Sequence, residues 1–156
     1  MENKKIIIFY HTQHGQNTKK LVEAIKSKYN SIEIHQTPCE ITDISSYDFV
    51  GFASGVYFWY FGKTIYEQIE KLIGLEGKKC FCLSTSGAGG SFKDCFKSEI
   101  EKKGGIYLGG FEIPGHTNYF PLSIFGGVNK GRPNEEDFNN SIKFLEEIVS
   151  KNSEAK

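Results

Sequence analysis

The sequence lacks a net charge, because 19 lysines and arginines balance 19 aspartates and glutamates among its 156 residues. Nucleic-acid binding generally requires a clear basic excess that neutralises phosphates, so this balance argues against that class of partner. The same balance argues against a strongly acidic surface that steers basic partners toward the protein.

Long apolar segments are lacking as well. No stretch approaches the roughly 20 apolar residues that a helix needs to cross a membrane, and Met1-Glu2-Asn3 has neither a basic segment nor a long apolar run. The start therefore does not have the character of a signal peptide. We expect a cytoplasmic protein that has no membrane partner and keeps its cysteines reduced.

Common metal and nucleotide motifs are also missing. Cys80 and Cys82 do not form a C-x-x-C pair, and their alternation along an expected strand places both on one face, which favours buried, unreactive thiols over a metal site. The motifs G-x-x-x-x-G-K-[ST] and G-x-G-x-x-G do not occur, which weakens the case for a nucleotide triphosphate or a dinucleotide.

Glycine and aromatic residues are plentiful, with 17 glycines and 14% aromatic residues. Many glycines indicate tight turns or backbone that approaches a ligand closely. Many aromatic side chains indicate a dense core, a stacking site, or both.

Short apolar runs alternate with segments of helical periodicity along the whole sequence. The expected strands are 6–10, 32–34, 49–53, 80–83 and 106–113. The expected helical faces lie in 21–29, 65–73, 92–100 and 134–149, with Asn134 capping the last helix. A long irregular stretch, 114–133, separates the last strand from the last helix.

This alternation predicts one α/β domain over residues 1–156, with a doubly wound, five-stranded parallel sheet and helices on both faces. The flavodoxin-like strand order 2-1-3-4-5 suits five units of this size. A ligand is then expected beyond the carboxyl ends of the strands, where the loops after strands one, three and four meet.

The loop after the first strand is expected to hold an anion. It is rich in hydroxyl and amide groups, it opens a helix whose first N–H groups lack partners, and it contains no lysine or arginine before Lys19. Neutral donors of this kind suit a terminal monophosphate, although an ordinary capped turn uses the same residue types. The candidate residues are Thr12, Gln13, His14, Gly15, Gln16, Asn17 and Thr18.

The loops after strands three and four are expected to hold a flat ring. Five consecutive aromatic residues, 57–61, suit the walls of a planar site, and small residues in both loops allow close approach of the backbone. An aromatic cluster under a lid or at a dimer face is the alternative. The candidate residues are Ser54, Gly55, Val56, Tyr57, Phe58, Trp59, Ser84, Thr85, Ser86 and Gly87.

These three segments, together with the segment 125–134, resemble the flavodoxins over nearly the whole chain. Tyr10 to Thr18 is similar to the flavodoxin phosphate loop, with Thr12, Asn17 and Thr18 as matching donors and Gln16 as a one-residue insertion. The resemblance implies a non-covalently bound FMN, with the three loops holding its phosphate, ribityl chain and isoalloxazine ring. No catalytic side chain is expected, and His14 and His116 are interpreted as solvated.

Electron transfer through FMN is the expected function, with a redox protein or a small electron donor or acceptor as the partner. An FMN-dependent NAD(P)H or quinone-type oxidoreductase and a flavin-free scaffold are the alternatives. Lys130 and Arg132 could receive an anionic partner or a pyridine-nucleotide phosphate, although a solvated basic loop is the preferred interpretation. His116, Asn118, Tyr119 and Phe120 could cover the ring. A monomer or a weak homodimer is expected.

Overall fold

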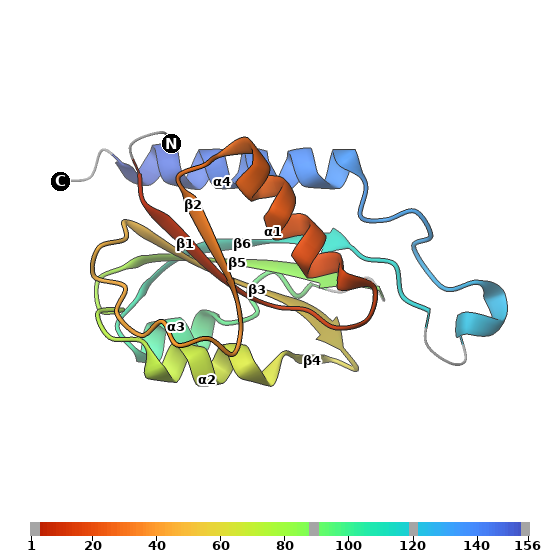
Figure 1. Ribbon diagram of the computed structural model, residues 1–156, viewed down its shortest axis with the longest axis horizontal. Coiled ribbons are helices and arrows are strands. Elements are labelled where there is room, and N and C mark those ends of the chain that lie inside the picture. The colour runs from red at the N-terminus through yellow and green to blue at the C-terminus, as the bar shows by residue number, and fades with distance from the viewer. Residues whose placement is uncertain (1–3, 88–90, 119–121, 154–156) are drawn as a thin grey trace.

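Five parallel strands form the centre of the protein in a computed structural model that describes residues 4–87, 91–118 and 122–153 (Figure 1). They are β1 (Ile6–His11), β2 (Ile32–Gln36), β3 (Phe49–Tyr57), β5 (Lys79–Ser86) and β6 (Ile106–Pro114). Their order is β2-β1-β3-β5-β6, and the short β4 (Tyr60–Phe61) pairs antiparallel with β3 only. The predicted order of the five parallel strands is therefore confirmed.

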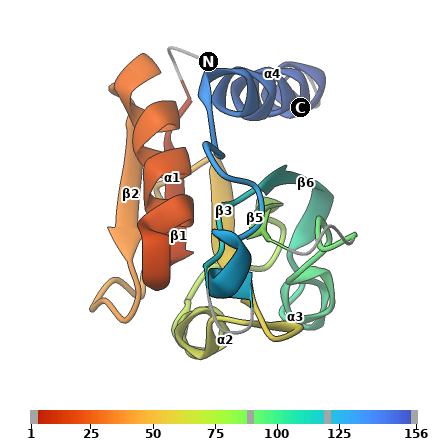
Figure 2. The same cartoon turned by 90° about the vertical axis from the view of Figure 1, so that its right-hand side faces the viewer.

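Helices cover both faces of this sheet. In Figures 1 and 2, α1 (Asn17–Lys28) and α4 (Glu135–Ser153) lie on one side, and α2 (Lys63–Lys71) and α3 (Lys97–Lys102) lie on the other. A hydrophobic core lies on each face of the sheet, and alternate residues of β1 enter the two cores. Ile6 and Ile8 pack in the core beneath α1 and α4, and Ile7 and Phe9 pack in the core beneath α2 and α3. All four are 0% exposed. This alternation explains why the strand reads as an unbroken apolar run.

The cysteines Cys80 and Cys82 belong to the core beneath α2 and α3, and both are 0% exposed. The prediction that they share one buried face is confirmed. Burial raises the pKa of Cys80 to about 12, so its thiol stays protonated at neutral pH. In the described ranges of the chain, no helix is both long enough and apolar enough to cross a membrane.

Two helical predictions differ from the structure. The helix α2 ends at Lys71, because Ile73 N–H donates to Thr42 O (2.8 Å) and pairs the backbone with the segment before β3. The Ile73 side chain is 66% exposed rather than part of the apolar face. The helix α3 begins only at Lys97, and Phe96 reaches the core from the turn that precedes it.

The stretch 114–133 is less irregular than predicted. Pro114 ends β6, Thr117 forms a β-bridge with Val128, and a 3₁₀ turn, η2 (Leu122–Phe125), lies between them. Residues 119–121 lie outside the described residues, and so does the expectation that Tyr119 and Phe120 cover a ligand.

The start of α4 is fixed by reciprocal hydrogen bonds. Asn134 Oδ1 accepts from Asp137 N–H (3.1 Å), Asp137 Oδ2 accepts from Asn134 N–H (2.8 Å), and Arg132 forms an ion pair with the Asp137 carboxylate. The predicted cap at Asn134 is confirmed. Burial acts to raise the pKa of Asp137, but its bonds from Arg132 and Asn134 lower it overall.

We expect Asp137→Asn to lower the free energy of unfolding by about 2 kcal/mol at pH 7, because it removes charged hydrogen bonds from a buried acceptor. A carboxylate with a lowered pKa stabilises the fold above its unfolded pKa of about 4, and this contribution disappears as pH falls through the folded value. Urea unfolding at pH 7 and pH 3 measures the difference. Glu136→Gln, an exposed neighbour, is the control. A difference as large at pH 3 as at pH 7 would contradict the account.

Candidate functional site

The carboxyl ends of β1, β3 and β5 bring the predicted site segments to one edge of the sheet. His11 pairs with Ser54, and Gly55 pairs with Thr85, so the ends of the three strands are level. This edge faces the viewer in Figure 2. The structure therefore gathers the first loop, the end of β3 and the end of β5, as the strand order requires. The His14 side chain lies outside the described part of the molecule.

The first loop makes a tight left-handed turn before α1. Gly15 has φ +75° and Gln16 has φ +51°, and Gln16 N–H donates to Gln13 O (3.0 Å). The helix α1 then starts at Asn17 with no side-chain cap from the described residues and no acidic residue in its first turn. Its first N–H groups and its positive dipole end are thus left for a ligand.

The polar atoms around this helix end match an anion. The hydroxyl oxygens of Thr12 and Ser84 and the Asn17 Oδ1 atom are buried, and they have no hydrogen-bond partner among the described residues. Buried polar groups are nearly always hydrogen-bonded, so unpaired ones at a ligand edge indicate a missing acceptor or donor. A phosphoryl group would accept from the Thr12 hydroxyl and from the helix N–H groups, and would need no cation. Ser84 alternates with Leu83 along β5 and therefore lies on the face of the sheet opposite α1.

The insertion at Gln16 offers a test of the loop geometry. A non-glycine residue in the left-handed region costs about 1 kcal/mol, so we expect Gln16→Gly to raise the free energy of unfolding by about 0.5–1 kcal/mol. Urea unfolding measures it. Gln36→Gly, in the extended strand β2, is the matched control and is expected to destabilise by a similar amount. Equal destabilisation by both changes would contradict the assigned turn.

The aromatic segment forms a hairpin rather than the predicted loop. The strand β3 continues through Tyr57, and Phe58 and Trp59 form a two-residue turn with φ +47° and +72° before Tyr60 pairs back with Tyr57. Such turns favour Asn and Gly, because both central residues need positive φ. Bulky residues here are strained, and strain of this kind concentrates at functional sites. Phe58, Trp59 and Tyr60 are 71%, 72% and 75% exposed.

A row of rings connects this hairpin to the core. The Trp59 ring lies 5.6 Å from that of Phe92, Phe92 lies 6.0 Å from Phe61, and Phe61 lies 5.3 Å from the buried Phe96. Phe92 N–H donates to Glu112 Oε2 (2.6 Å), which ties this ring to β6. The sequence assigns Phe92 to a helical face, whereas the structure places it beside the hairpin, in contact with Trp59 and Phe61.

Small polar residues at the ends of β3 and β5 form hydrogen bonds that fix the structure of the candidate site. Ser54 Oγ accepts from Gly62 N–H (2.9 Å) and donates to Gly55 O (2.8 Å), which fixes the base of the hairpin. The buried hydroxyls of Thr18 and Thr85 are 3.0 Å apart and join α1 to β5. The segment Ser84–Ser86 therefore belongs to β5 and not to a loop, which corrects the prediction.

His116 and Asn129, which follow β6, are hydrogen-bonded to this edge. Asn17 Nδ2 donates to His116 O (2.9 Å), and Asn129 Nδ2 donates to Gly87 O (3.2 Å). The His116 Nε2 atom is buried, so the interpretation of His116 as a solvated histidine is wrong. Arg132 is paired with Asp137 and anchors the segment 115–132 to α4, which differs both from the preferred interpretation as a solvated cation and from the alternative of a contact for anions.

His11 also lies at this candidate site, although the sequence did not indicate it as a candidate residue. Its Nδ1 atom lies 2.8 Å from Thr64 Oγ1 of α2, and its ring packs edge-on against Tyr57 with centroids 5.8 Å apart. The sequence places His11 at the end of the first strand, which is a signal for a ligand-edge residue. Its contact with Thr64 depends on how α2 packs and has no sequence signal.

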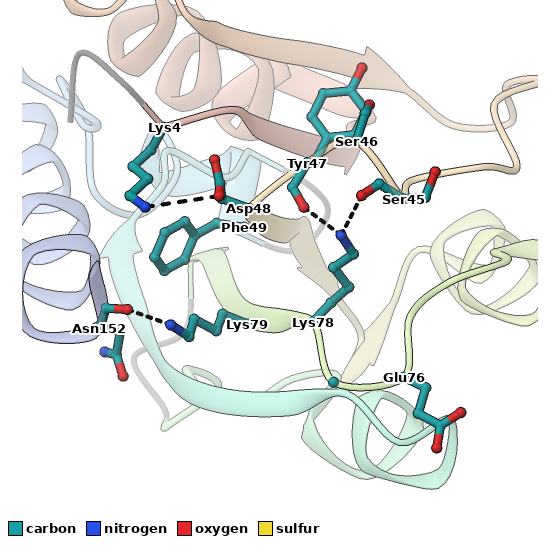
Figure 3. A pocket seen from close by; sticks show the side chains of 11 residues that line it. Lys4, Ser45, Ser46, Tyr47, Asp48, Phe49, Glu76, Lys78, Lys79 and Asn152 are labelled. Carbon is teal, nitrogen blue, oxygen red and sulfur yellow. Dashed lines mark hydrogen bonds and ion pairs between the residues drawn. The ribbon is translucent and has the colours of Figure 1, made fainter. Parts of the chain in front are cut away.

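The opposite, amino edge of the sheet holds a hollow of about 400 Å³ (Figure 3). Lys78 Nζ donates to Ser45 O (2.7 Å) and Tyr47 O (2.6 Å), and Lys79 Nζ donates to Asn152 O. Lys4 lies 3.9 Å from the Asp48 carboxylate. The lysines of this hollow thus join the ends of neighbouring segments, and it is a structural junction.

Comparisons with known proteins place this geometry in context. The sequence matches the family model described as Flavodoxin domain over residues 7–103. It is 32% identical over 148 residues to an uncharacterised protein of Methanocaldococcus jannaschii, covering 93% of this chain and 98% of that protein.

Two solved structures share the fold. Oxidised flavodoxin 2 from Bacillus cereus has a TM-score of 0.64 at 16% identity and covers 94% of this chain and 99% of its own. General stress protein 14 from Treponema denticola, solved in complex with FMN, has a TM-score of 0.64 at 11% identity, with coverages of 92% and 99%. At these identities the similarity concerns the fold alone.

Proposed function

Because the chain belongs to the flavodoxin domain family, we propose that it is a redox protein that binds one FMN non-covalently at the carboxyl edge of its sheet. One observation carries the proposal. The uncapped start of α1 lies at the same edge as the buried Thr12 hydroxyl, which has no hydrogen-bond partner among the described residues. FMN supplies a ring that accepts and releases electrons, while the protein supplies position and electrostatics.

The first loop is proposed to hold the phosphate. The Thr12 hydroxyl and the backbone N–H groups of Gly15, Asn17 and Thr18 are its donors, because the Gln16 N–H is bonded to Gln13 O and the Thr18 hydroxyl is paired with Thr85. The Asn17 side chain keeps the segment 115–132 in place through His116 O. A site of neutral donors distinguishes a monophosphate from a triphosphate, which usually needs a lysine and a magnesium ion.

The hairpin and Phe92 are proposed to wall the ring. Trp59 and Phe92 already pack together, and the backbone of Gly55, Val56 and Tyr57 runs along the same edge. Offset stacking on aromatic side chains contributes roughly 0.5–1.5 kcal/mol beyond the buried area. Ser84, Thr85 and Ser86 end β5 beside the carboxyl end of β3, and the ribityl chain is proposed to lie near them.

Electron transfer to a partner is the form of redox activity that we propose. The hairpin turn leaves three aromatic side chains largely exposed beside the site, which suits contact with a redox protein or a small electron acceptor. Arg132, the cation that seemed suited to a nucleotide phosphate in the sequence, is paired with Asp137. This pairing favours the electron carrier over an NAD(P)H-dependent reductase.

Trp59 gives a direct test, because it is the only tryptophan in the chain. Addition of FMN to the apoprotein is expected to quench Trp59 fluorescence and to saturate at one FMN per chain. Anaerobic reduction of the complex by dithionite should then be complete, while NADH and NADPH alone should reduce it slowly. Trp59→Phe removes the emission and retains a ring, so it isolates the flavin signal. Absence of saturable quenching would overturn the proposed function, and rapid reduction by either nucleotide would favour the reductase.

A further inference from the structure

We propose that Tyr57 and His11 are positioning residues that hold Gln13 and thereby preform the phosphate site of the first loop. This inference rests on the proposed function, because the ligand that benefits is the FMN phosphate. Neither residue is proposed to touch the phosphate. Their effect passes through Gln13, which precedes the left-handed turn of the loop.

Tyr57 reaches the loop from the hairpin. Its hydroxyl oxygen accepts a hydrogen bond from Gln13 N–H (2.9 Å). The Tyr57 side chain crosses Gly55 to do so, because a Cβ atom on Gly55 would lie only 2.6 Å from the Tyr57 hydroxyl. A glycine at position 55 is therefore required for this contact. The bond joins the proposed ring wall to the proposed phosphate loop.

His11 holds the Gln13 side chain through an ordered chain of hydrogen bonds. The Thr37 hydroxyl donates to Tyr10 O (3.3 Å), so it accepts from Thr64 (2.7 Å), and Thr64 in turn accepts from His11 Nδ1–H (2.8 Å). The Nε2 atom of His11 is then left to accept from Gln13 Nε2 (3.2 Å). Burial lowers the pKa of His11, which keeps the imidazole neutral and suited to these roles.

Gln13 is consequently held at each of its functional groups. Its N–H is bonded to Tyr57, its carbonyl to Gln16 N–H (3.0 Å), and its side-chain amide to His11. These bonds make Gln13 a brace within the protein, although its type alone suggests a phosphate contact. Because Gln13 is exposed and these bonds lie within the protein, we infer that they support the conformation of the backbone that follows it.

The backbone that follows is the part that needs support. Gly15 and Gln16 are both left-handed, and a glutamine in that region is strained by about 1 kcal/mol. Strained backbone persists only where the surroundings fix it. A loop held in its binding form before the ligand arrives avoids the ordering cost of binding. The hydrogen bonds to Gln13 should therefore raise the part of the FMN affinity that depends on the phosphate.

Tyr57→Phe tests this directly, with FMN and riboflavin as paired probes. The change removes one hydroxyl and retains the ring. We expect FMN affinity to fall about fivefold to tenfold, in keeping with the loss of one hydrogen bond, while riboflavin affinity stays within about twofold because it has no phosphate. Tyr47→Phe is the matched control, since it removes a hydroxyl that is hydrogen-bonded to Glu33 at the opposite edge of the sheet. Fluorescence titration measures both constants.

Thr64→Val is a second variant, because it lies on α2 and removes the hydroxyl that joins His11 to Thr37 without changing the first loop or the hairpin. Its FMN affinity is expected to fall by about twofold to fivefold, again without loss of riboflavin affinity. Equal losses for FMN and riboflavin, or no loss in either variant, would overturn the inference. Tighter FMN binding by Tyr57→Phe would also overturn it, because Tyr57 would then block the site. If the wild-type protein binds no FMN, the proposed function fails first and this inference fails with it.

Discussion

Asn17→Asp is expected to lower FMN affinity by about a hundredfold or more. The change places a carboxylate at the first residue of α1, where the proposed phosphate lies, and two like charges about 4–6 Å apart at a protein surface repel by about 3–4 kcal/mol. It also removes the amide donor to His116 O, so an acceptor faces an acceptor there. Riboflavin affinity should change little, because riboflavin carries no phosphate.

The fold should tolerate this change better than the ligand does. An acidic residue in the first turn of a helix gains about 0.3–1 kcal/mol from the helix dipole, which partly offsets the lost hydrogen bond. Asn139→Asp, an exposed position of α4, is the matched control and should leave both affinities unchanged. Equal weakening of FMN and riboflavin by Asn17→Asp would contradict the assignment of the phosphate to the start of α1.

Gly110→Ala is expected to destabilise the protein by about 3 kcal/mol, at the upper end of overpacking effects. A Cβ atom at position 110 would lie 1.8 Å from the backbone oxygen of Lys93 and 2.8 Å from the Tyr107 hydroxyl. The nearest obstacle is backbone, so the turn before α3 would have to move away from β6. Phe92, which precedes that turn and packs on Trp59, would move with it.

Urea unfolding measures the loss of stability, and the free energy for Gly110→Ala should be compared with that for Gly126→Ala. Gly126 has φ +80°, and no described atom lies within 4 Å of the point that an alanine Cβ would occupy, so alanine there meets only backbone strain. We expect that control to cost about 1 kcal/mol. Similar losses at the two positions would show that the close approach of β6 to the Lys93 carbonyl is not what requires glycine at 110.

The strand order could be predicted from the sequence because burial on two faces leaves a distinctive pattern. The run Ile6–Ile8 is apolar without alternation, since successive residues enter different cores. Isoleucines alternating with polar residues in 32–34 indicate the edge strand β2. These patterns reflect local periodicity, which a single sequence preserves.

The hairpin could not be predicted in the same way. A two-residue turn is usually recognised by Asn or Gly, and here its central residues are Phe58 and Trp59. The partner strand β4 contains only Tyr60 and Phe61, too short for a periodic signal. The run of aromatic residues was expected at the carboxyl edge of the sheet, where the structure places it, but its hairpin backbone was not expected.

The braces of the site depend on tertiary packing. His11 meets Thr64 only because α2 packs beside the end of β1, and Tyr57 meets Gln13 across 44 positions of sequence. The role of Arg132 could not be predicted either, because a basic residue in a glycine-rich stretch suggests a free cation. Its ion pair with Asp137 depends on the tertiary structure. Residue type indicated the chemistry of the edge, whereas the structure determined which groups remain available to a ligand.

An amide-resolved NMR titration of the ¹⁵N-labelled apoprotein with FMN tests the central claim most directly. The account predicts saturable shifts concentrated in residues 12–18, 54–61 and 84–87, with the amides around Lys78 at the opposite edge unaffected. Riboflavin should reproduce the shifts of the hairpin but not those at the start of α1. Shifts centred on the amino edge, or none at a stoichiometric excess of FMN, would contradict it.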